Sequence, residues 1–157
     1  AGLAAAIVAG AQIVGGLLVP VFRRLFSRRT HALLFAGAVS VIALVVVGST
    51  DSFFVAIGCI VVWAMAFSAA TPMRQAYVNG LIPSDQRATV LSFDALMSST
   101  GGVVSQPALG RAADVWSFST SYLISSVVAA AAIPFYALAR KERAASDPIE
   151  LSPESAR

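Results

Sequence analysis

Residues 53–76 read FFVAIGCIVVWAMAFSAATPMRQA, and Arg74 is the only charged side chain among them. A helix rises by about 1.5 Å per residue, so a helix of this length covers the ~30 Å hydrocarbon layer of a bilayer. The stretch is also too apolar to form an amphipathic helix with one apolar and one polar face. It therefore predicts a helix that crosses a membrane.

Four more apolar blocks flank this stretch, and short segments between them hold nearly all of the charge. The expected spans are residues 2–22, 32–48, 53–76, 88–109 and 118–139. Only 12% of the 157 residues are charged, about half the usual share in a soluble domain. We therefore predict an all-α membrane bundle of five helices over residues 1–139. Residues 140–157 are expected to form a polar, disordered tail.

Basic residues alternate between the two ends of successive spans. The basic segments contain Arg23, Arg24, Arg28 and Arg29 after the first span, Arg74 and Arg87 around the third linker, and Arg140, Lys141 and Arg143 after the fifth. No basic residue follows the second span, and Arg111 alone follows the fourth. The positive-inside bias then places the arginine-rich loop and the tail in the cytoplasm, in a multi-pass protein of the cell membrane.

Several function classes lack their sequence signals. The basic residues lie at span ends rather than along one polar helix, which argues against a nucleic-acid partner. Cys59 and His31 are the only cysteine and histidine, so the chain shows no metal-ligand spacing. It also lacks a nucleophile and base pair, paired carboxylates and a phosphate-binding glycine loop. We expect no enzyme activity, cofactor, metal or nucleic acid.

Polar side chains within the spans are the candidates for a solute path. They are Gln12, Ser68, Thr71, Gln75, Asp94 and Ser98. Polar groups at membrane depth face protein or a water-filled cavity, so the first, third and fourth spans are expected to be central. Residues 32–48 and 118–139 hold no charged or amide side chain and are expected to face lipid.

Each of these candidates has an alternative, structural interpretation. Asp94, the only acid clearly inside a span, could titrate during transport. It could equally reach the interface, or pair with Arg87 or Arg74 as a structural link. The hydroxyls of Ser68 and Thr71 could line a path, or bond to their own helix or a neighbour.

Small residues and prolines indicate close packing or helix bending. Candidates for this role are Gly16, Pro72, Gly101, Gly102, Pro107 and Gly110.

Two stretches resemble the major facilitator superfamily around its tenth and eleventh helices. They are residues 71–75, TPMRQ, and residues 82–92, IPSDQRATVLS. The similarity continues through residues 101–114, where GVVSQPALG at 102–110 is similar in spacing to a glycine and proline signature of family antiporters. The loop after the first span departs from the family motif: Gly16, Arg28 and Arg29 remain, but the acidic residue is absent.

The resemblance implies helices eight to twelve of a twelve-helix transporter, inactive without its N-terminal half. It implies a secondary active transporter of a small solute, with export of an amphipathic compound against protons as the specific expectation. The expected partners are the lipid bilayer, the N-terminal half, a small-molecule substrate and protons. The alternative is a membrane scaffold or binding subunit that transports nothing. We also expect Ala1, which follows no methionine or signal peptide, to be a truncation point.

Overall fold

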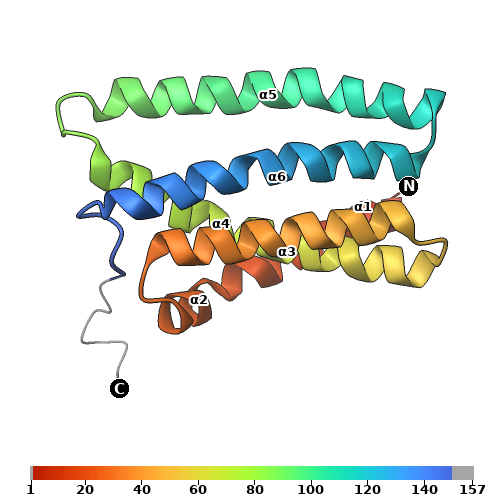
Figure 1. Cartoon of the computed structure of the whole chain (residues 1–157), viewed down its shortest axis with the longest axis horizontal. Coiled ribbons are helices and arrows are strands. Elements are labelled where there is room, and N and C mark those ends of the chain that lie inside the picture. Colours follow the sequence, from red (N-terminus) through yellow and green to blue (C-terminus); the bar gives the residue numbers. More distant parts are fainter. Residues whose placement is uncertain (1, 150–157) are drawn as a thin grey trace.

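The computed structural model describes residues 2–149, apart from the side chains of residues 3–5. The described residues form α1 (Gly2–Leu17), α2 (Val19–Leu25), α3 (Arg29–Ser49), α4 (Phe53–Leu81), α5 (Arg87–Val115) and α6 (Phe118–Glu142). The long helices lie roughly along one common axis, and short connections join them at the two ends of the bundle (Figure 1). The predicted all-α class is confirmed.

Helices α3, α4 and α6 are long and apolar enough to cross a membrane. The pair α1 and α2 forms a fourth candidate span if the two count as one, because a 46° bend separates them. Pro20 explains the bend, since its ring and missing N–H disrupt the preceding turn of helix. Helix α5 matches α4 in length, 29 residues each, but is not among the spans found by length and hydropathy.

The helices extend beyond the apolar blocks that predicted them. Residues 77–81 complete α4, so Asn79 and Gly80 lie in its last turn rather than in the expected linker. Helix α5 likewise continues to Val115, past residue 109. A helix needs backbone hydrogen bonds and not apolar side chains, so it can extend into the interface where the sequence turns polar.

Helix α3 is the most enclosed helix of the described chain. It packs against both α4 and α6 and contributes more buried residues than any other helix. Residues 32–48, expected to be peripheral, are thus well enclosed within the described chain, although Phe35 and Ile42 are exposed on their outer side. Helix α5, expected to be central, packs mainly on α6, and Ala112 is its only buried residue.

Two glycines let helices approach closely. A Cβ placed on Gly15 of α1 would lie 2.5 Å from the backbone oxygen of Met65 in α4. A Cβ on Gly48 of α3 would lie 3.0 Å from the backbone oxygen of Ser119 in α6. Both pairs of helices therefore meet backbone to backbone, as small residues allow in membrane bundles.

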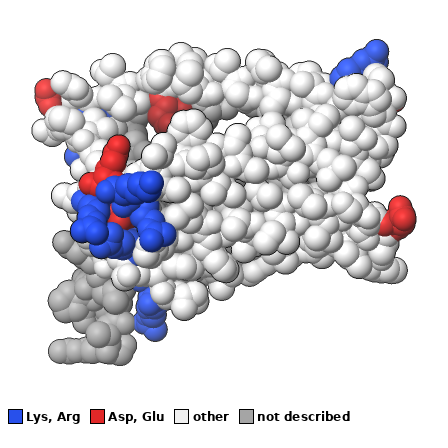
Figure 2. All heavy atoms as spheres, in the orientation of Figure 1, with Lys and Arg blue, Asp and Glu red and all other residues white. Residues whose placement is uncertain are grey.

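Charged side chains gather at the two ends of the bundle and leave the visible band between them almost uncharged (Figure 2). The α2–α3 loop, the α4–α5 loop and the segment after α6 lie at one end, which we call the basic end (Figure 1). The segment after α6 folds back there, and Asp147 is only 1% exposed. Residues 140–149, expected to be part of a disordered tail, instead belong to α6 and to this folded-back segment. Residues 150–157 lie outside the described residues.

Candidate functional site

Three of the predicted path residues meet in one open hollow between α1, α2 and α4. We call it the basic-end hollow; its volume is about 540 Å³. Its lining consists of Gln12, Gly16, Val19, Phe67, Ser68, Thr71 and Pro72. The first and third predicted spans therefore form a common polar-lined surface.

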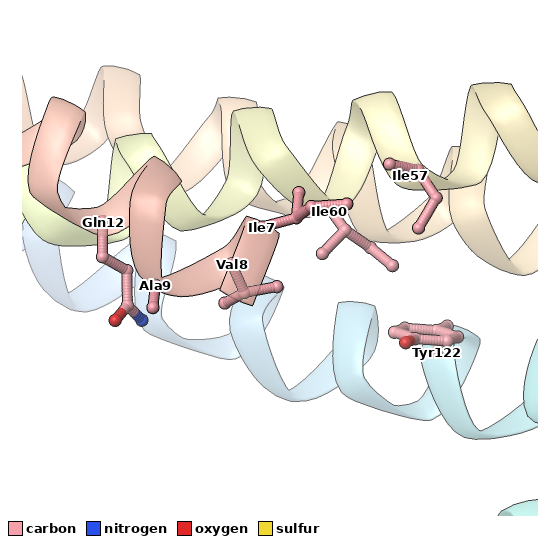
Figure 3. Close-up of a pocket in the computed structure, with 7 residues that line it drawn as sticks. All are labelled: Ile7, Val8, Ala9, Gln12, Ile57, Ile60 and Tyr122. Carbon is pink, nitrogen blue, oxygen red and sulfur yellow. The ribbon is translucent and has the colours of Figure 1, made fainter. Parts of the chain in front are cut away.

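A second hollow of about 390 Å³ lies between α1, α4 and α6, and we call it the far hollow. Its lining consists of Ile7, Val8, Ala9, Gln12, Ile57, Ile60 and Tyr122. Figure 3 shows Gln12 toward one side of this space and Tyr122 toward the other. Gln12 belongs to both hollows.

The two hollows follow one another along the contact between α1 and α4. At about 100° per residue, the lining residues of α4 fall on one side of that helix, and so do most of those of α1. The far hollow uses residues nearer the start of α4, and the basic-end hollow uses residues nearer its end. Together they form a seam that leads from one end of the bundle toward the other, with Gln12 between them.

The hydroxyl groups at the seam already donate hydrogen bonds within the protein. Ser68 Oγ donates to the backbone oxygen of Gln12 over 2.7 Å, which joins α4 to α1. Thr71 Oγ1 donates to the backbone oxygen of Phe67 in its own helix over 2.9 Å. These are the structural roles considered for the two hydroxyls. Among the described residues no charged side chain lines either hollow, so the exposed amide of Gln12 and the phenol of Tyr122 are the main polar groups offered to a solute.

Asp94 of α5 pairs with Arg74 of α4 and not with Arg87. Arg74 Nη1 donates to Asp94 Oδ2 over 3.1 Å, and Nη2 donates to Oδ1. The Arg74 side chain remains 40% exposed and the Asp94 side chain 32% exposed. The structural link considered for Asp94 is therefore present, and it ties α5 to α4 across a region where the backbones have few contacts.

The remaining candidates lie away from the seam. Gln75 and Ser98 are exposed and line neither hollow. A Cβ placed on Gly101 or Gly110 would meet no atom of the described chain within 4 Å, and one on Gly102 would meet only Gln106 of its own helix. The small-residue face of α5 is thus uncovered by the described chain.

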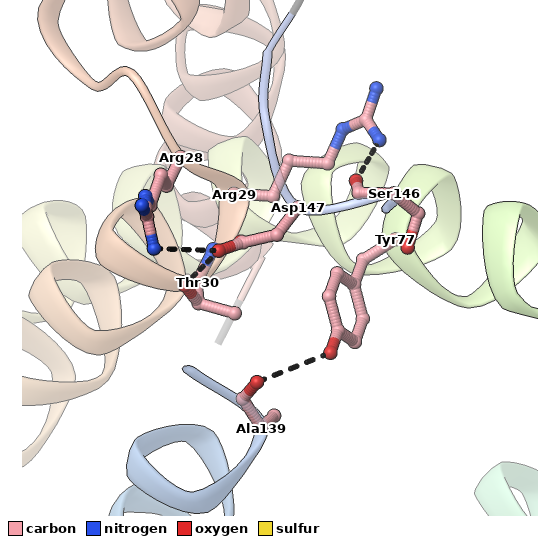
Figure 4. Close-up of polar contacts among 7 residues, drawn as sticks. All are labelled: Arg28, Arg29, Thr30, Tyr77, Ala139, Ser146 and Asp147. Atoms are coloured by element: carbon pink, nitrogen blue, oxygen red, sulfur yellow. Dashed lines mark hydrogen bonds and ion pairs between the residues drawn. The ribbon is translucent and has the colours of Figure 1, made fainter. Parts of the chain in front are cut away.

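Sequence reasoning missed the polar cluster at the basic end, where the segment after α6 meets the start of α3 (Figure 4). Asp147 Oδ1 accepts a hydrogen bond from the backbone N–H of Thr30 over 2.9 Å. Asp147 Oδ2 accepts from Thr30 Oγ1 over 3.1 Å and lies 3.9 Å from Arg28 Nη1. Nothing in a polar, proline-containing tail distinguishes this one aspartate from its neighbours.

Long apolar helices, charged ends and an uncharged seam define a polytopic helical membrane protein. The family model of the Major Facilitator Superfamily matches residues 1–156, so the chain belongs to this superfamily, whose members are transporters rather than enzymes. Neither the curated proteins nor the solved structures contain a match to it.

Proposed function

We propose that the chain is the C-terminal portion of a twelve-helix secondary active transporter and that the α1–α4 seam lines its solute path. The observation that carries the proposal is the pair of hollows that share Gln12 along one seam. Membership of the superfamily supports transport as the activity. The seam is the proposed location of that activity in this chain.

In this proposal the described helices cross the membrane five times, as helices eight to twelve. The bent pair α1 and α2 is the first crossing, and α3, α4, α5 and α6 are the others. Helix α5 lies alongside α6 (Figure 1), which supports α5 as a crossing as well. Its polar and small-residue face then packs against the N-terminal half, which this chain lacks.

The proposed orientation places the basic end, with the C-terminal tail, in the cytoplasm of a cell-membrane protein. Arg23 and Arg24 lie in the last turn of α2, and Arg140 and Lys141 lie in the last turn of α6. Both turns are at the basic end. This asymmetry is the one that the positive-inside bias associates with the cytoplasmic face.

The proposed solute is a small, amphipathic compound without a net charge. A charged solute would lose its hydration in the seam without gaining a counter-charge, which is costly in an apolar environment. An uncharged compound can bury its apolar surface and accept or donate one hydrogen bond at Gln12. Transport is proposed to be export driven by protons, with Asp94 as the group that would release Arg74 and take up a proton.

Solute flux through the intact protein in proteoliposomes tests this function. Three ring compounds that differ in one group, benzamide, benzoate and benzylamine, are supplied with and without an imposed proton gradient. We expect gradient-dependent movement of neutral benzamide and little of the two ions. The same three compounds and a wider panel of drugs, sugars and organic acids are also measured in liposomes without protein. If every flux is equal with and without protein, the result would favour the alternative, a membrane subunit that transports nothing.

The Asp94→Asn variant tests the coupling separately. If Asp94 carries the proton, this variant loses the gradient dependence but still exchanges solute across the membrane. Normal transport by Asp94→Asn at every pH would remove the coupling role.

A further inference from the structure

We propose that α2 is a hinged flap over the basic end of the solute path, and that residues 143–149 form a strap that holds it shut. Three neighbouring features support this inference. They are the bend before α2, the basic-end hollow beside α2, and the buried Asp147 carboxylate at the start of α3, which follows α2 in the chain. The inference concerns a movement within this chain, so it goes beyond the proposed transport and its test does not require transport.

The hinge lies at Leu18, between α1 and α2. The backbone N–H of Leu18 is shared between the backbone oxygens of Val14 and Gly15, over 3.1 and 3.2 Å. A shared bond of this kind marks the end of a regular helix. Helix α2 then leaves at 46°. Because Pro20 lies two residues further on and has no backbone N–H, straightening would not restore a full ladder of hydrogen bonds, so the bend is a natural pivot.

The apolar side chains of the flap pack at the edge of the core and not within it. No residue of α2 is buried within the described chain, and Val19 forms part of the wall of the basic-end hollow. Val19 and Phe22 are only partly buried where they pack on the core formed by Ala32, Leu33 and Met73. Rotation about Leu18 would therefore move one wall of the hollow without disrupting the α1–α4 or α3–α6 contacts.

The strap fixes the chain directly after the flap (Figure 4). The backbone N–H of Ile149 donates to the backbone oxygen of Ser27 over 3.1 Å, and that of Arg29 donates to the backbone oxygen of Asp147 over 2.9 Å. Ile149 also packs on the same core as Val19 and Phe22. The strap thus holds the far end of the flap by backbone bonds and by apolar contact.

The Asp147 carboxylate completes the lock by occupying the start of α3. It accepts from the backbone and the hydroxyl of Thr30 and is almost fully buried. A carboxylate at this position satisfies N–H groups that the first turn of a helix leaves unbonded, and it is stabilised by the helix dipole. The α2–α3 loop contains no acid of its own, so the strap supplies it from the other end of the chain.

The strap is also poised to open. Two buried polar atoms, Asn79 Oδ1 near the end of α4 and Ser146 Oγ of the strap itself, have no hydrogen-bond partner among the described residues. Such atoms disfavour the closed arrangement, since water would satisfy them once the strap leaves. Gly80 is the position that allows closure, because a Cβ there would collide with Ser146.

Gly80 provides the test variant, and Gly58 of the same helix provides its control. Gly80→Ala should unseat the strap, whereas Gly58→Ala adds the same methyl group where no atom of the described chain lies within 4 Å. Both variants replace a glycine of α4 by alanine. Asp147→Ala removes the lock by a second route that leaves α4 unchanged.

Two measurements on the intact protein in membrane vesicles report on the strap and the flap. Hydrogen exchange in a peptide covering residues 27–33 reports on the Arg29 and Thr30 amides, which Asp147 protects. Reaction of Thr71→Cys with a water-soluble maleimide added at the basic end, in an otherwise cysteine-free protein, reports on access to the hollow. We expect Gly80→Ala and Asp147→Ala to accelerate both severalfold and Gly58→Ala to change neither.

Two results would overturn the inference. Unchanged exchange in both test variants would mean that the strap does not hold the start of α3. Faster exchange with an unchanged rate of Thr71→Cys labelling would mean that the strap opens without moving a flap. Neither result depends on whether the protein transports a solute.

Discussion

At the scale of single residues, Ser68 and Thr71 show how similar hydroxyl groups serve different contacts. Ser68 bonds across the α1–α4 contact, whereas Thr71 bonds to its own helix. We predict that Ser68→Ala lowers the free energy of unfolding by about 0.5–1 kcal/mol. Thr71→Val should lower it less, because its carbonyl partner keeps its helical bond. Unfolding of the purified protein in detergent would measure both; equal losses would contradict the assignment.

The Arg74–Asp94 pair permits a double-mutant cycle. The pair is half-exposed, so we expect a coupling energy of about 1 kcal/mol in the free energy of unfolding. Arg74→Ala and Asp94→Ala should each destabilise the protein, and the double variant should lose less than their sum. Strictly additive losses would show that the two side chains do not stabilise each other.

At the scale of helices, the α1–α4 contact depends on Gly15. Gly15→Ala should separate the two helices and cost about 1–3 kcal/mol of stability, as overpacking does in other cores. Gly10→Ala is the matched control in the same helix, since no atom of the described chain lies within 4 Å of that position. It should leave stability unchanged or raise it by up to about 1 kcal/mol. Thermal unfolding of the two variants in the same detergent makes the comparison.

The sequence predicted most of the helices because apolar length is a strong signal. Helices α3, α4 and α6 appear where uninterrupted apolar blocks lie. Their ends were less predictable: Asn79 and Gly80 form a turn signal, yet the helix continues through both, and Gly80 lies against Ser146 of the strap. The break at Leu18 lay inside an apolar block, between Gly16 and Pro20.

The candidate site was only partly predictable for a similar reason. Polar residues at membrane depth stand out, so Gln12, Ser68 and Thr71 could be found, and the structure brings them together. The residue that Ser68 contacts is distant in the sequence, so the sequence alone does not identify it. Gly15 looked no different from Gly16, and Asp147 looked like any tail residue, although one sets a helix contact and the other is buried.

At the scale of the whole molecule, the ends of the helices should lie on opposite sides of the membrane. We predict that Ser27→Cys, in the loop at the basic end, reacts with an impermeant maleimide only from the cytoplasm. Ser117→Cys, between α5 and α6, should react only from outside. These experiments use the intact protein in cells and in inverted vesicles. The reverse pattern would invert the proposed orientation.

The solute path itself is tested most directly by comparing two glutamines. Gln12 joins the two hollows of the seam, whereas Gln75 is exposed on α4 and lines neither. Gradient-driven flux of a neutral solute is measured for Gln12→Leu and Gln75→Leu in proteoliposomes with equal amounts of folded protein. We expect a large loss of flux for Gln12→Leu and near-normal flux for Gln75→Leu. Normal flux in Gln12→Leu would contradict the proposed path.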